Sequence, residues 1–435
     1  MKAPVYDVLV IGFGPAALGL AAAVEDKTRD GELDLSVKFI EKASSFSWHS
    51  NFLLPGTTIN HHYFRDLATP RDPSSKFTFI KYLKEKGRLF EFGHFSGYPT
   101  RVEWNDYLSW AANKLDSYVQ YDTEAYHVEW NNAFNLLEIS TSKGTFLARH
   151  LVLATGLKMR IHQRYYPLLS KTLFHSSKFI EMLKANNFSP ASEKKVLVVG
   201  SGQSAAEAVL YLRNRFSNWD IDSLHSAVGF KIKESGHLSN IIYHPEETDY
   251  FYGLEAHKKA IVLQDMTTAD YGNVNNATSE QLFNRIYEDK VLGINKIKMI
   301  DRSTVHAIEQ EGEQYQVTIR EIYKDHFTIE NYDLIVLCTG YYEEKYPVIL
   351  KEISHHLLND NEEMLCLNRN YKVEHKSEHD LNIYIYGGSE RTHGISDTQS
   401  FTLMAIKANW ILDEICAKFS KDKMIQLVSA NGTVE

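Results

Sequence analysis

Two glycine-rich strand–turn–helix segments and two apolar strands that end in Thr-Gly predict an α/β protein. The first glycine-rich segment covers residues 5–19 (VYDVLVIGFGPAALG) and the second covers residues 194–207 (KKVLVVGSGQSAAE). Each joins a β-branched run to a glycine turn and then a helical run, as in a parallel sheet that helices cover on both faces. We therefore predict two Rossmann-like dinucleotide-binding domains, the second inserted into the first.

The nesting follows from the two Thr-Gly strands, residues 151–156 (LVLATG) and 334–340 (LIVLCTG), where the chain is expected to leave or re-enter a domain. We expect residues 1–165 and 332–435 to form the first domain. Residues 166–331 form the second and carry a small helical segment.

Shorter elements follow from local patterns. Alternating apolar and polar residues with turn pairs predict a β-meander over 118–151. Amphipathic periodicity predicts helices over 101–115, 279–289 and 402–418.

Composition excludes several classes of protein. The 435 residues are 43% hydrophobic and 24% charged, which is typical of a globular chain. A net charge of −9 argues against a nucleic-acid partner, because phosphate backbones attract basic surfaces. Three cysteines without a CxxC pair argue against a disulfide framework, a redox-active disulfide and a zinc site. The sequence contains no run of 18 apolar residues, so we expect no transmembrane segment. No signal peptide is recognised before the first strand, so we expect a cytoplasmic protein.

The first glycine motif reads Gly12-x-Gly14-Pro15-x-Ala17. Its first glycine permits a tight turn, its second lets backbone approach a pyrophosphate, and its small third residue lets the helix pack on the strand. Glu41 ends the next strand, where a carboxylate can bind a ribose hydroxyl. It lies 27 residues after Gly14, and a polar loop insertion explains the excess over the usual ~20.

The second motif has Gly200 and Gly202, with Gln203 and Ser204 at the start of its helix. No carboxylate closes the following strand, which ends in His225. That environment favours a 2′-phosphate, and therefore NADPH over NADH. Two nested nucleotide domains indicate a flavin that a nicotinamide reduces, so the expected cofactors are FAD and NADPH.

Further motifs resemble those of the flavin-dependent N-hydroxylating monooxygenases, in order and over nearly the whole chain. They are Ser47-Trp48-His49, Leu54-Pro55-Gly56-Thr57-Thr58, Arg65-Asp66-Leu67-Ala68-Thr69, Arg101-x-Glu103-Trp104, Thr339-Gly340-Tyr341 and Thr392-His393-Gly394. The resemblance implies that reduced flavin reacts with O2 to give a C4a-hydroperoxyflavin, which bound NADP+ shields. A neutral primary amine then takes the distal oxygen, for siderophore biosynthesis. It also implies a homotetramer.

The resemblance assigns roles to single residues. Asn60 and Asn240 take catalytic positions, and Asn60 also lies near the flavin. The helical segment at about 236–295 contacts the substrate. Expected cofactor contacts are Trp48, His49, Thr339 and Gly340. Expected substrate contacts are His62, Arg65, Asn240, Asn275 or Asn276, and Ser400 or Thr402. No metal is expected, because adjacent histidines such as His61 and His62 on a strand point to opposite faces.

The substrate is inferred from the segment Ile59–Asp66 (INHHYFRD). In one interpretation the Arg65 guanidinium grips the carboxylate of L-ornithine or L-lysine. In the other, Arg65 serves a structural ion pair such as one with Asp72, and the substrate lacks a carboxylate. We favour the second, with histamine ahead of putrescine and cadaverine because imidazole stacks on His and Tyr rings. A nucleotide-binding protein without turnover is the alternative from another class.

Overall fold

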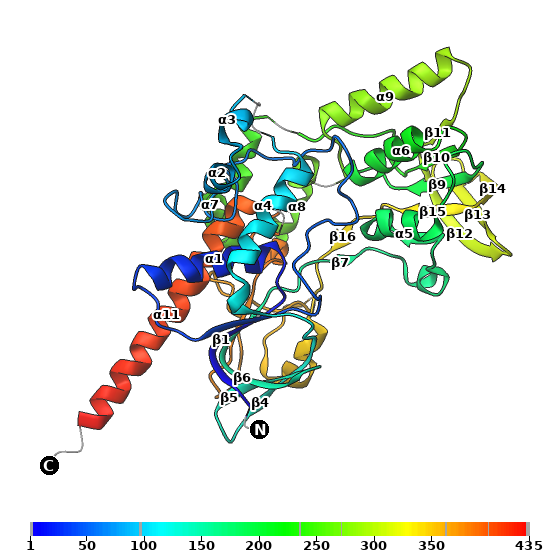
Figure 1. The fold of residues 1–435 in the computed structure, drawn as a ribbon. Coiled ribbons are helices and arrows are strands. Elements are labelled where there is room, and N and C mark those ends of the chain that lie inside the picture. Colours follow the sequence, from blue (N-terminus) through cyan, green and yellow to red (C-terminus); the bar gives the residue numbers. More distant parts are fainter. Residues whose placement is uncertain are drawn as a thin grey trace.

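The computed structural model describes residues 3–94, 98–234, 236–270, 272–361, 363–398 and 400–431, with side chains left out of account at 267–270 and from 420 onward. Two parallel sheets lie in separate lobes, each with its own helices (Figure 1). This arrangement confirms the predicted α/β fold with two Rossmann-like units. In the described ranges no helix combines the length and apolar character that crossing a membrane requires.

The first sheet is built on β1 and β6, with strand order β3-β2-β1-β6-β5-β4 and β17 also paired to β6. Its parallel strands are β1 (Val5–Ile11), β2 (Val37–Ile40), β3 (Val119–Gln120), β6 (Gly144–Leu153) and β17 (Asn382–Ile385). The antiparallel strands β4 (Ala125–Asn131) and β5 (Leu136–Thr141) join β6 in the predicted meander.

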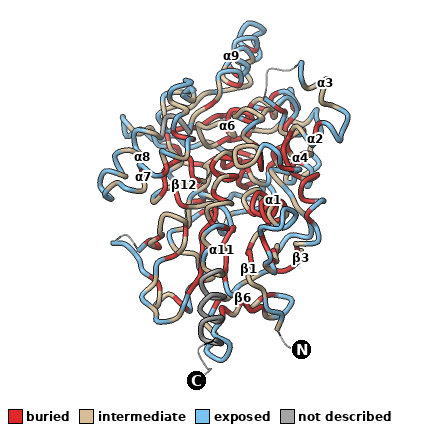
Figure 2. The backbone as a smooth tube through the Cα atoms, turned by 90° about the vertical axis from the view of Figure 1, so that its left-hand side faces the viewer, coloured by how far each residue is buried: buried red, intermediate tan, exposed pale blue. Residues whose placement is uncertain are grey.

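Helices cover one face of this sheet. Val8 and Val10 of β1 point into a core with α1 (Pro15–Arg29), α4 (Arg101–Lys114) and α11 (Phe401–Asn431). On the other face, the alternate residues pack against the meander and a 3₁₀ helix, η5 (Val348–His356). Figure 2 shows buried residues concentrated along β1 and α1. The remaining short helices here are α2 (Phe79–Glu85), α3 (Leu89–Phe92) and η1 (Asp116–Tyr118).

The second sheet has five parallel strands in the order β11-β10-β9-β15-β8. They are β8 (Leu173–His175), β9 (Lys195–Val199), β10 (Asp220–Leu224), β11 (Ile297–Ile300) and β15 (Leu334–Leu337). One face carries α5 (Phe179–Asn186), α6 (Gln203–Arg215) and α9 (Asn276–Val291). The other carries an antiparallel sheet of β12 (Ser303–Glu311), β13 (Gln314–Glu321) and β14 (Phe327–Tyr332). Two 3₁₀ helices, η2 (Gln163–Leu168) and η3 (Ser176–Lys178), complete the lobe.

The chain crosses between lobes at two adjacent strands. β7 (Lys158–Met159) and β16 (Tyr341–Tyr342) pair antiparallel, and Figure 1 shows this ribbon between the sheets. The expected return to the first domain at residue 332 is therefore wrong. Residues 334–337 lie between β9 and β8 in the second sheet, so the return comes after Gly340.

One segment of the first lobe is buried in the core of the second. Phe52 and Leu54 pack among the side chains of α5 and α6, with the Phe52 and Phe179 ring centroids 5.4 Å apart. The backbone N–H of Ile180 also donates to the carbonyl oxygen of Asn51 at 3.1 Å. The two lobes therefore share an apolar interface.

The helical segment expected at about 236–295 divides between the lobes. α7 (Pro245–Tyr252) and α8 (Ala256–Asp270) lie against the short helix α10 (Glu390–His393) of the first lobe, and η4 (Ser239–Tyr243) contacts α7. In contrast, α9 packs on α6 of the second lobe. The final helix α11 begins at Phe401 and continues to Asn431, well past the expected end at 418.

Prediction one concerns His150 of β6, which is 3% exposed and stacks on Phe419. Burial, then Lys418 and Lys372, lower the pKa of His150 from 6.5 to about 3. Between these pH values the unfolded chain binds a proton that the folded chain does not, so stability falls as pH falls below 6.5. From pH 7.5 to pH 5 this group should remove about 2 kcal/mol from the free energy of unfolding.

Urea unfolding at both pH values tests this. His150→Phe should show a smaller loss between pH 7.5 and pH 5 than the wild type, while His257→Gln, at an exposed position, should match the wild type. An unchanged pH dependence in His150→Phe would contradict a neutral, buried imidazole.

Candidate functional site

The first glycine turn is fixed by a close approach of two strands. Gly12 has φ +98°, and a Cβ there would lie 2.5 Å from the carbonyl oxygen of Ala154, at the end of β6. Its N–H donates to the carbonyl of Ile40, at the end of β2. Only glycine fits a position with both this dihedral angle and this contact.

The second turn repeats the same geometry. Gly200 has φ +141°, and a Cβ there would collide with the carbonyl oxygen of Cys338. Its N–H donates to Leu224 at the end of β10. Ala154 and Cys338 each precede the Thr-Gly pair of their strand. Cys338 is buried, as expected for a core residue.

Both turns present the N-terminus of a helix. Gly14 and Gly202 are the N-cap residues of α1 and α6, and neither helix has a side-chain cap. A Cβ on Gly14 would meet no atom within 4 Å, whereas one on Gly202 would lie 3.6 Å from Gly272. The N–H groups of α1 therefore face space that a pyrophosphate can fill, and α6 offers a narrower site of the same kind. Pro15 begins α1, and Ala17 is fully buried against the sheet.

Glu41 follows β2 and braces the first turn. Its carboxylate accepts hydrogen bonds from the backbone N–H of Phe13 at 2.7 Å and of Ala43 at 2.8 Å. The predicted carboxylate thus stands at the expected strand end, beside Gly12 and Gly14.

His225 follows β10 and is buried. It is 2% exposed, its Nδ1 contacts the carbonyl oxygen of Ile300 at 3.2 Å, and burial lowers the pKa of its imidazole. A buried neutral ring is a poor partner for a 2′-phosphate. The contact of His225 with the cofactor stays a prediction that these contacts do not favour.

Residues 57–78 form an irregular loop that a buried carboxylate organises. We call it the substrate loop, because it carries the predicted substrate contacts His62 and Arg65. Asp66 is fully buried and accepts four hydrogen bonds: the N–H groups of Ala68, Thr69 and Phe79 and the hydroxyl of Thr69, all at 2.6–2.9 Å. The Tyr107 hydroxyl also binds this loop, at the N–H of Leu67 and the carbonyl of Phe77. Asp66 of the Arg65-Asp66 motif therefore has a structural role. Its hydrogen bonds fix the loop backbone from which the Arg65 side chain extends.

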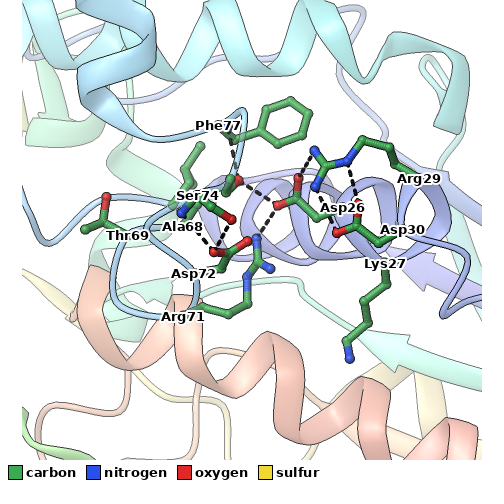
Figure 3. A network of polar contacts seen from close by, with 12 residues as sticks. Asp26, Lys27, Arg29, Asp30, Ala68, Thr69, Arg71, Asp72, Ser74 and Phe77 are labelled. Carbon is green, nitrogen blue, oxygen red and sulfur yellow. Dashed lines mark hydrogen bonds and ion pairs between the residues drawn. The ribbon is translucent and has the colours of Figure 1, made fainter.

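A second carboxylate ties the loop to α1 (Figure 3). Asp26 accepts from Arg71 at 2.7 Å and from the Ser75 hydroxyl at 2.6 Å, and both residues of the Arg71–Asp26 ion pair are nearly buried. Asp72 instead binds Ser74 on its own loop. The loop is consequently attached to the helix that starts at Gly14.

Arg65 lies over the ring of Tyr243, with its guanidinium carbon 4.6 Å from the ring centroid. Within the described residues it makes no ion pair, and Asp72 is engaged with Ser74. The suggested Arg65–Asp72 ion pair was therefore wrong. A partly buried guanidinium without a carboxylate partner is suited to bind one from a ligand.

Two of the predicted asparagines meet across the lobes. The Asn275 amide donates to Asn60 at 3.2 Å, while its oxygen caps α9 at the N–H of Thr278. Asn276 turns to Glu280 on the outer face of α9, so of the two candidates Asn275 is the one that contacts Asn60. Asn240 lies on η4, three residues before Tyr243, and is partly buried.

Aromatic rings lie beside these groups. His61 packs against Trp104 and Phe401, with centroids 5.1 and 5.2 Å apart, and Trp48 contacts Phe401. Burial, assisted by Arg65 and Lys233, lowers the pKa of His61 to about 4, so its ring is neutral at physiological pH.

His62 stacks instead on Tyr63 and Phe64, outside this cluster. His49, at φ 48°, contacts Trp48 edge-on.

The C-terminal candidates differ in what their hydroxyls do. Ser400 Oγ accepts from the N–H of Leu403 in the first turn of α11. Thr402 Oγ1 is buried without a hydrogen-bond partner in the described part of the chain. Thr339 and Gly340 lie at the crossover, where the carbonyl oxygen of Gly340 accepts from Arg160 and contacts His175. Ser204 lies in the first turn of α6.

Sequence reasoning missed three residues of this site as contributors. Tyr243 supports Arg65, while Arg101 and Glu207 form a buried ion pair between the lobes. The i,i+4 spacing of Gln203 and Glu207 on a helix was a visible signal for their contact. Nothing local indicates Arg101 as the partner of Glu207, 106 positions away.

The sequence matches that of a known protein family over most of its length. The sequence profile described as L-lysine 6-monooxygenase/L-ornithine 5-monooxygenase matches residues 4–343. The chain belongs to this family.

An L-ornithine N(5)-oxygenase of Arthrobotrys oligospora is 30% identical, over 95% of this chain and 89% of its own length. A Kutzneria sp. 744 ornithine N-hydroxylase, solved with reduced FAD, NADP+ and L-ornithine, is 28% identical with a TM-score of 0.89, covering 95% of this chain and all of its own. An L-lysine 6-monooxygenase of Pseudomonas syringae is 37% identical with a TM-score of 0.86, covering 94% and 99%. The resemblance to the N-hydroxylating monooxygenases is confirmed, and the protein is an oxidoreductase of this class.

Prediction two concerns the loop frame. In Asp66→Asn an amide NH₂ faces the N–H of Phe79 or of Ala68 and Thr69, so at least one buried bond is lost and a donor is left unpaired. We expect a loss of about 2–4 kcal/mol in the free energy of unfolding. Asp72→Asn, on the same loop but bonded only to Ser74, should cost less than about 1 kcal/mol. Urea titration of both variants measures the difference, and equal costs would contradict the role assigned to Asp66.

Proposed function

We propose that this protein uses FAD, NADPH and O2 to hydroxylate the side-chain amine of an α-amino acid, L-lysine ahead of L-ornithine. The observation that carries the substrate class is Arg65, a guanidinium that stacks on Tyr243 and has no carboxylate partner within the described residues. The 37% identity to the Pseudomonas syringae L-lysine 6-monooxygenase supports L-lysine ahead of L-ornithine as the substrate. The earlier preference for histamine loses its main support, because Arg65 makes no ion pair with Asp72.

The two helix N-termini fit the two cofactors. FAD would lie against Gly12, Gly14 and Glu41, where a Cβ on Gly14 meets open space. NADPH would lie against Gly202 and the start of α6. When bound, these groups supply the electrons and the activated oxygen.

The chain's own contribution is to bind the amine and to favour its neutral form. Arg65 would hold the α-carboxylate in a bidentate fork, while Asn60, Asn240 and Asn275 supply neutral hydrogen-bonding groups. The positive charges of Arg65 and Lys233, which help to lower the pKa of His61, also disfavour a protonated amine nearby. The packed rings of His61, Trp104 and Phe401 keep water from this side of the site.

Histamine stays as a second candidate for one reason. His62, Tyr63 and Phe64 form a cluster of tilted rings with centroids 4.2–5.1 Å apart, against which an imidazole ring could pack. The siderophore pathway, the homotetramer and the cytoplasmic location stay predictions from the sequence.

Prediction three tests the carboxylate contact. Arg65→Ala should raise KM for L-lysine about 10- to 100-fold, since a hydrogen bond to a charged group contributes about 1.5–3 kcal/mol. Arg65→Lys should restore part of the loss. Hydroxylamine formation from cadaverine, which has no carboxylate, is the matched control and should change little. A wild-type preference for histamine, with no effect of Arg65→Ala on any substrate, would replace the amino-acid proposal. Absence of hydroxylamine with every amine would leave a nucleotide-binding protein without turnover.

Prediction four separates the cofactor sites. Gly14 has φ −79°, so Gly14→Val is compatible with the fold, but its side chain would fill the space before α1. We expect a folded protein without bound flavin, measured by absorbance. Gly202→Val should keep FAD and lose reduction by NADPH, while dithionite still reduces the flavin. Normal flavin content in Gly14→Val, or normal reduction of Gly202→Val by NADPH, would contradict the assignment of the respective site.

A further inference from the structure

We propose that the Arg101–Glu207 ion pair is an interdomain positioning device that holds Asn275 against Asn60 through the side chain of Gln203. The inference rests on the proposed function for its kinetic consequences, because Asn60 and Asn275 are there placed at the amine. The structural part of the inference depends only on contacts within and between the two lobes.

The Arg101–Glu207 ion pair is largely buried and bidentate. Arg101 donates from Nη1 and Nη2 to the two carboxylate oxygens of Glu207, at 2.7 and 2.9 Å. The Glu207 side chain is 4% exposed and that of Arg101 is 13% exposed. Arg101 begins α4 of the first lobe and Glu207 lies in α6 of the second, so the pair fixes these helices to each other in distance and in orientation.

Gln203 links the Arg101–Glu207 ion pair to α9. Its amide nitrogen donates to Glu207 at 2.7 Å and to the hydroxyl of Thr278 at 2.8 Å. Its amide oxygen accepts from the backbone N–H of Asn275 at 2.8 Å. With both of its polar atoms engaged, Gln203 has one orientation, and the N-terminus of α9 is set by it.

The polar chain returns to the first lobe at the substrate loop. The Asn275 amide donates to Asn60 at 3.2 Å. The backbone N–H of Arg101 donates to the carbonyl of Thr57, and that of Ile59 donates to Pro99. The backbone of Arg101 therefore bonds to the substrate loop, while its side chain bonds to Glu207 of α6. Together these hydrogen bonds form a closed ring of contacts that passes through both lobes.

This ring links the second glycine motif to the amine site. Gln203 is the first residue of α6, directly after Gly202, where a nucleotide phosphate would be held. Glu207 is a positioning residue: its carboxylate oxygens accept from Arg101 and Gln203, and through Gln203 it determines where Asn275 points. Without it, reduction should proceed while the amine is held less well, so that NADPH is spent without hydroxylamine.

The chain provides a matched control in the same two helices. Arg213 of α6 and Asp289 of α9 form a second buried, bidentate ion pair, with hydrogen bonds from Nε and Nη2 of Arg213 at 2.6 and 2.8 Å. The Arg213 side chain is 5% exposed and that of Asp289 is 2% exposed. This ion pair lies within the second lobe and contacts neither Asn275 nor the substrate loop. Asp289→Asn thus reports the general effect of breaking a buried ion pair between α6 and α9.

The test compares Glu207→Gln, Arg101→Lys and the double variant Arg101→Gln/Glu207→Gln with Asp289→Asn, all as full-length protein loaded with FAD. The double variant removes both buried charges, so it is expected to fold even if a single variant leaves one charge stranded. Two readouts are used. Hydrogen exchange follows the backbone amides of Asn275 and Thr278, and steady-state kinetics gives KM for L-lysine and hydroxylamine formed per NADPH.

We expect at least tenfold faster exchange at Asn275 and Thr278 in Glu207→Gln and in the double variant, with a KM for L-lysine raised severalfold and a lower yield per NADPH. NADPH oxidation itself should stay within about twofold, and Asp289→Asn should show none of these local changes. Unchanged exchange and yield in the folded double variant, or the same pattern in Asp289→Asn, would overturn the proposal. If the wild type makes no hydroxylamine, the proposed function fails, while the exchange data still decide the structural part.

Discussion

A contact between a glycine and a carbonyl group, made once in each lobe, determines the layout of this protein. Gly12 lies against the carbonyl of Ala154 and Gly200 against that of Cys338, so that no side chain separates the turn from the neighbouring strand. The closeness lets the following helix begin directly above the strand ends, with its N–H groups directed at a ligand. The same strands then end in Thr-Gly, which sends the chain toward the other lobe through β7 and β16.

The substrate side is built differently, because its residues lie on an irregular loop. Two buried carboxylates replace the missing backbone ladder: Asp66 gathers the N–H groups of the loop, and Asp26 fastens the loop to α1. Charged side chains are rarely buried in this way unless their hydrogen-bonding capacity is filled. These acidic groups are already engaged, so neither of them pairs with Arg65.

Much of the fold could be predicted from the sequence, since the glycine turns, the meander at 118–151 and the helices at 101–115 and 279–289 are encoded by local patterns. The errors have distant causes. Residues 334–337 join the second sheet because β8 and β9 flank them. Arg65 was given Asp72 as a partner by proximity in sequence, while Tyr243, 178 positions away, is the residue it contacts. The resemblance located Asn60 and Asn275 without showing that they touch.

Phe52 and Leu54 lie in the first lobe by connectivity but in the second lobe's core by packing. The second domain, cut out between the crossover strands, would therefore lack part of its interior and expose an apolar cavity where these two side chains belong. Exchange of whole nucleotide domains between relatives has the same limitation: a transplanted module must bring its own version of residues 51–54, or the recipient's segment must match the new interior. For recombination and library design, the transferable unit is discontinuous, with one short piece located more than a hundred residues before the rest.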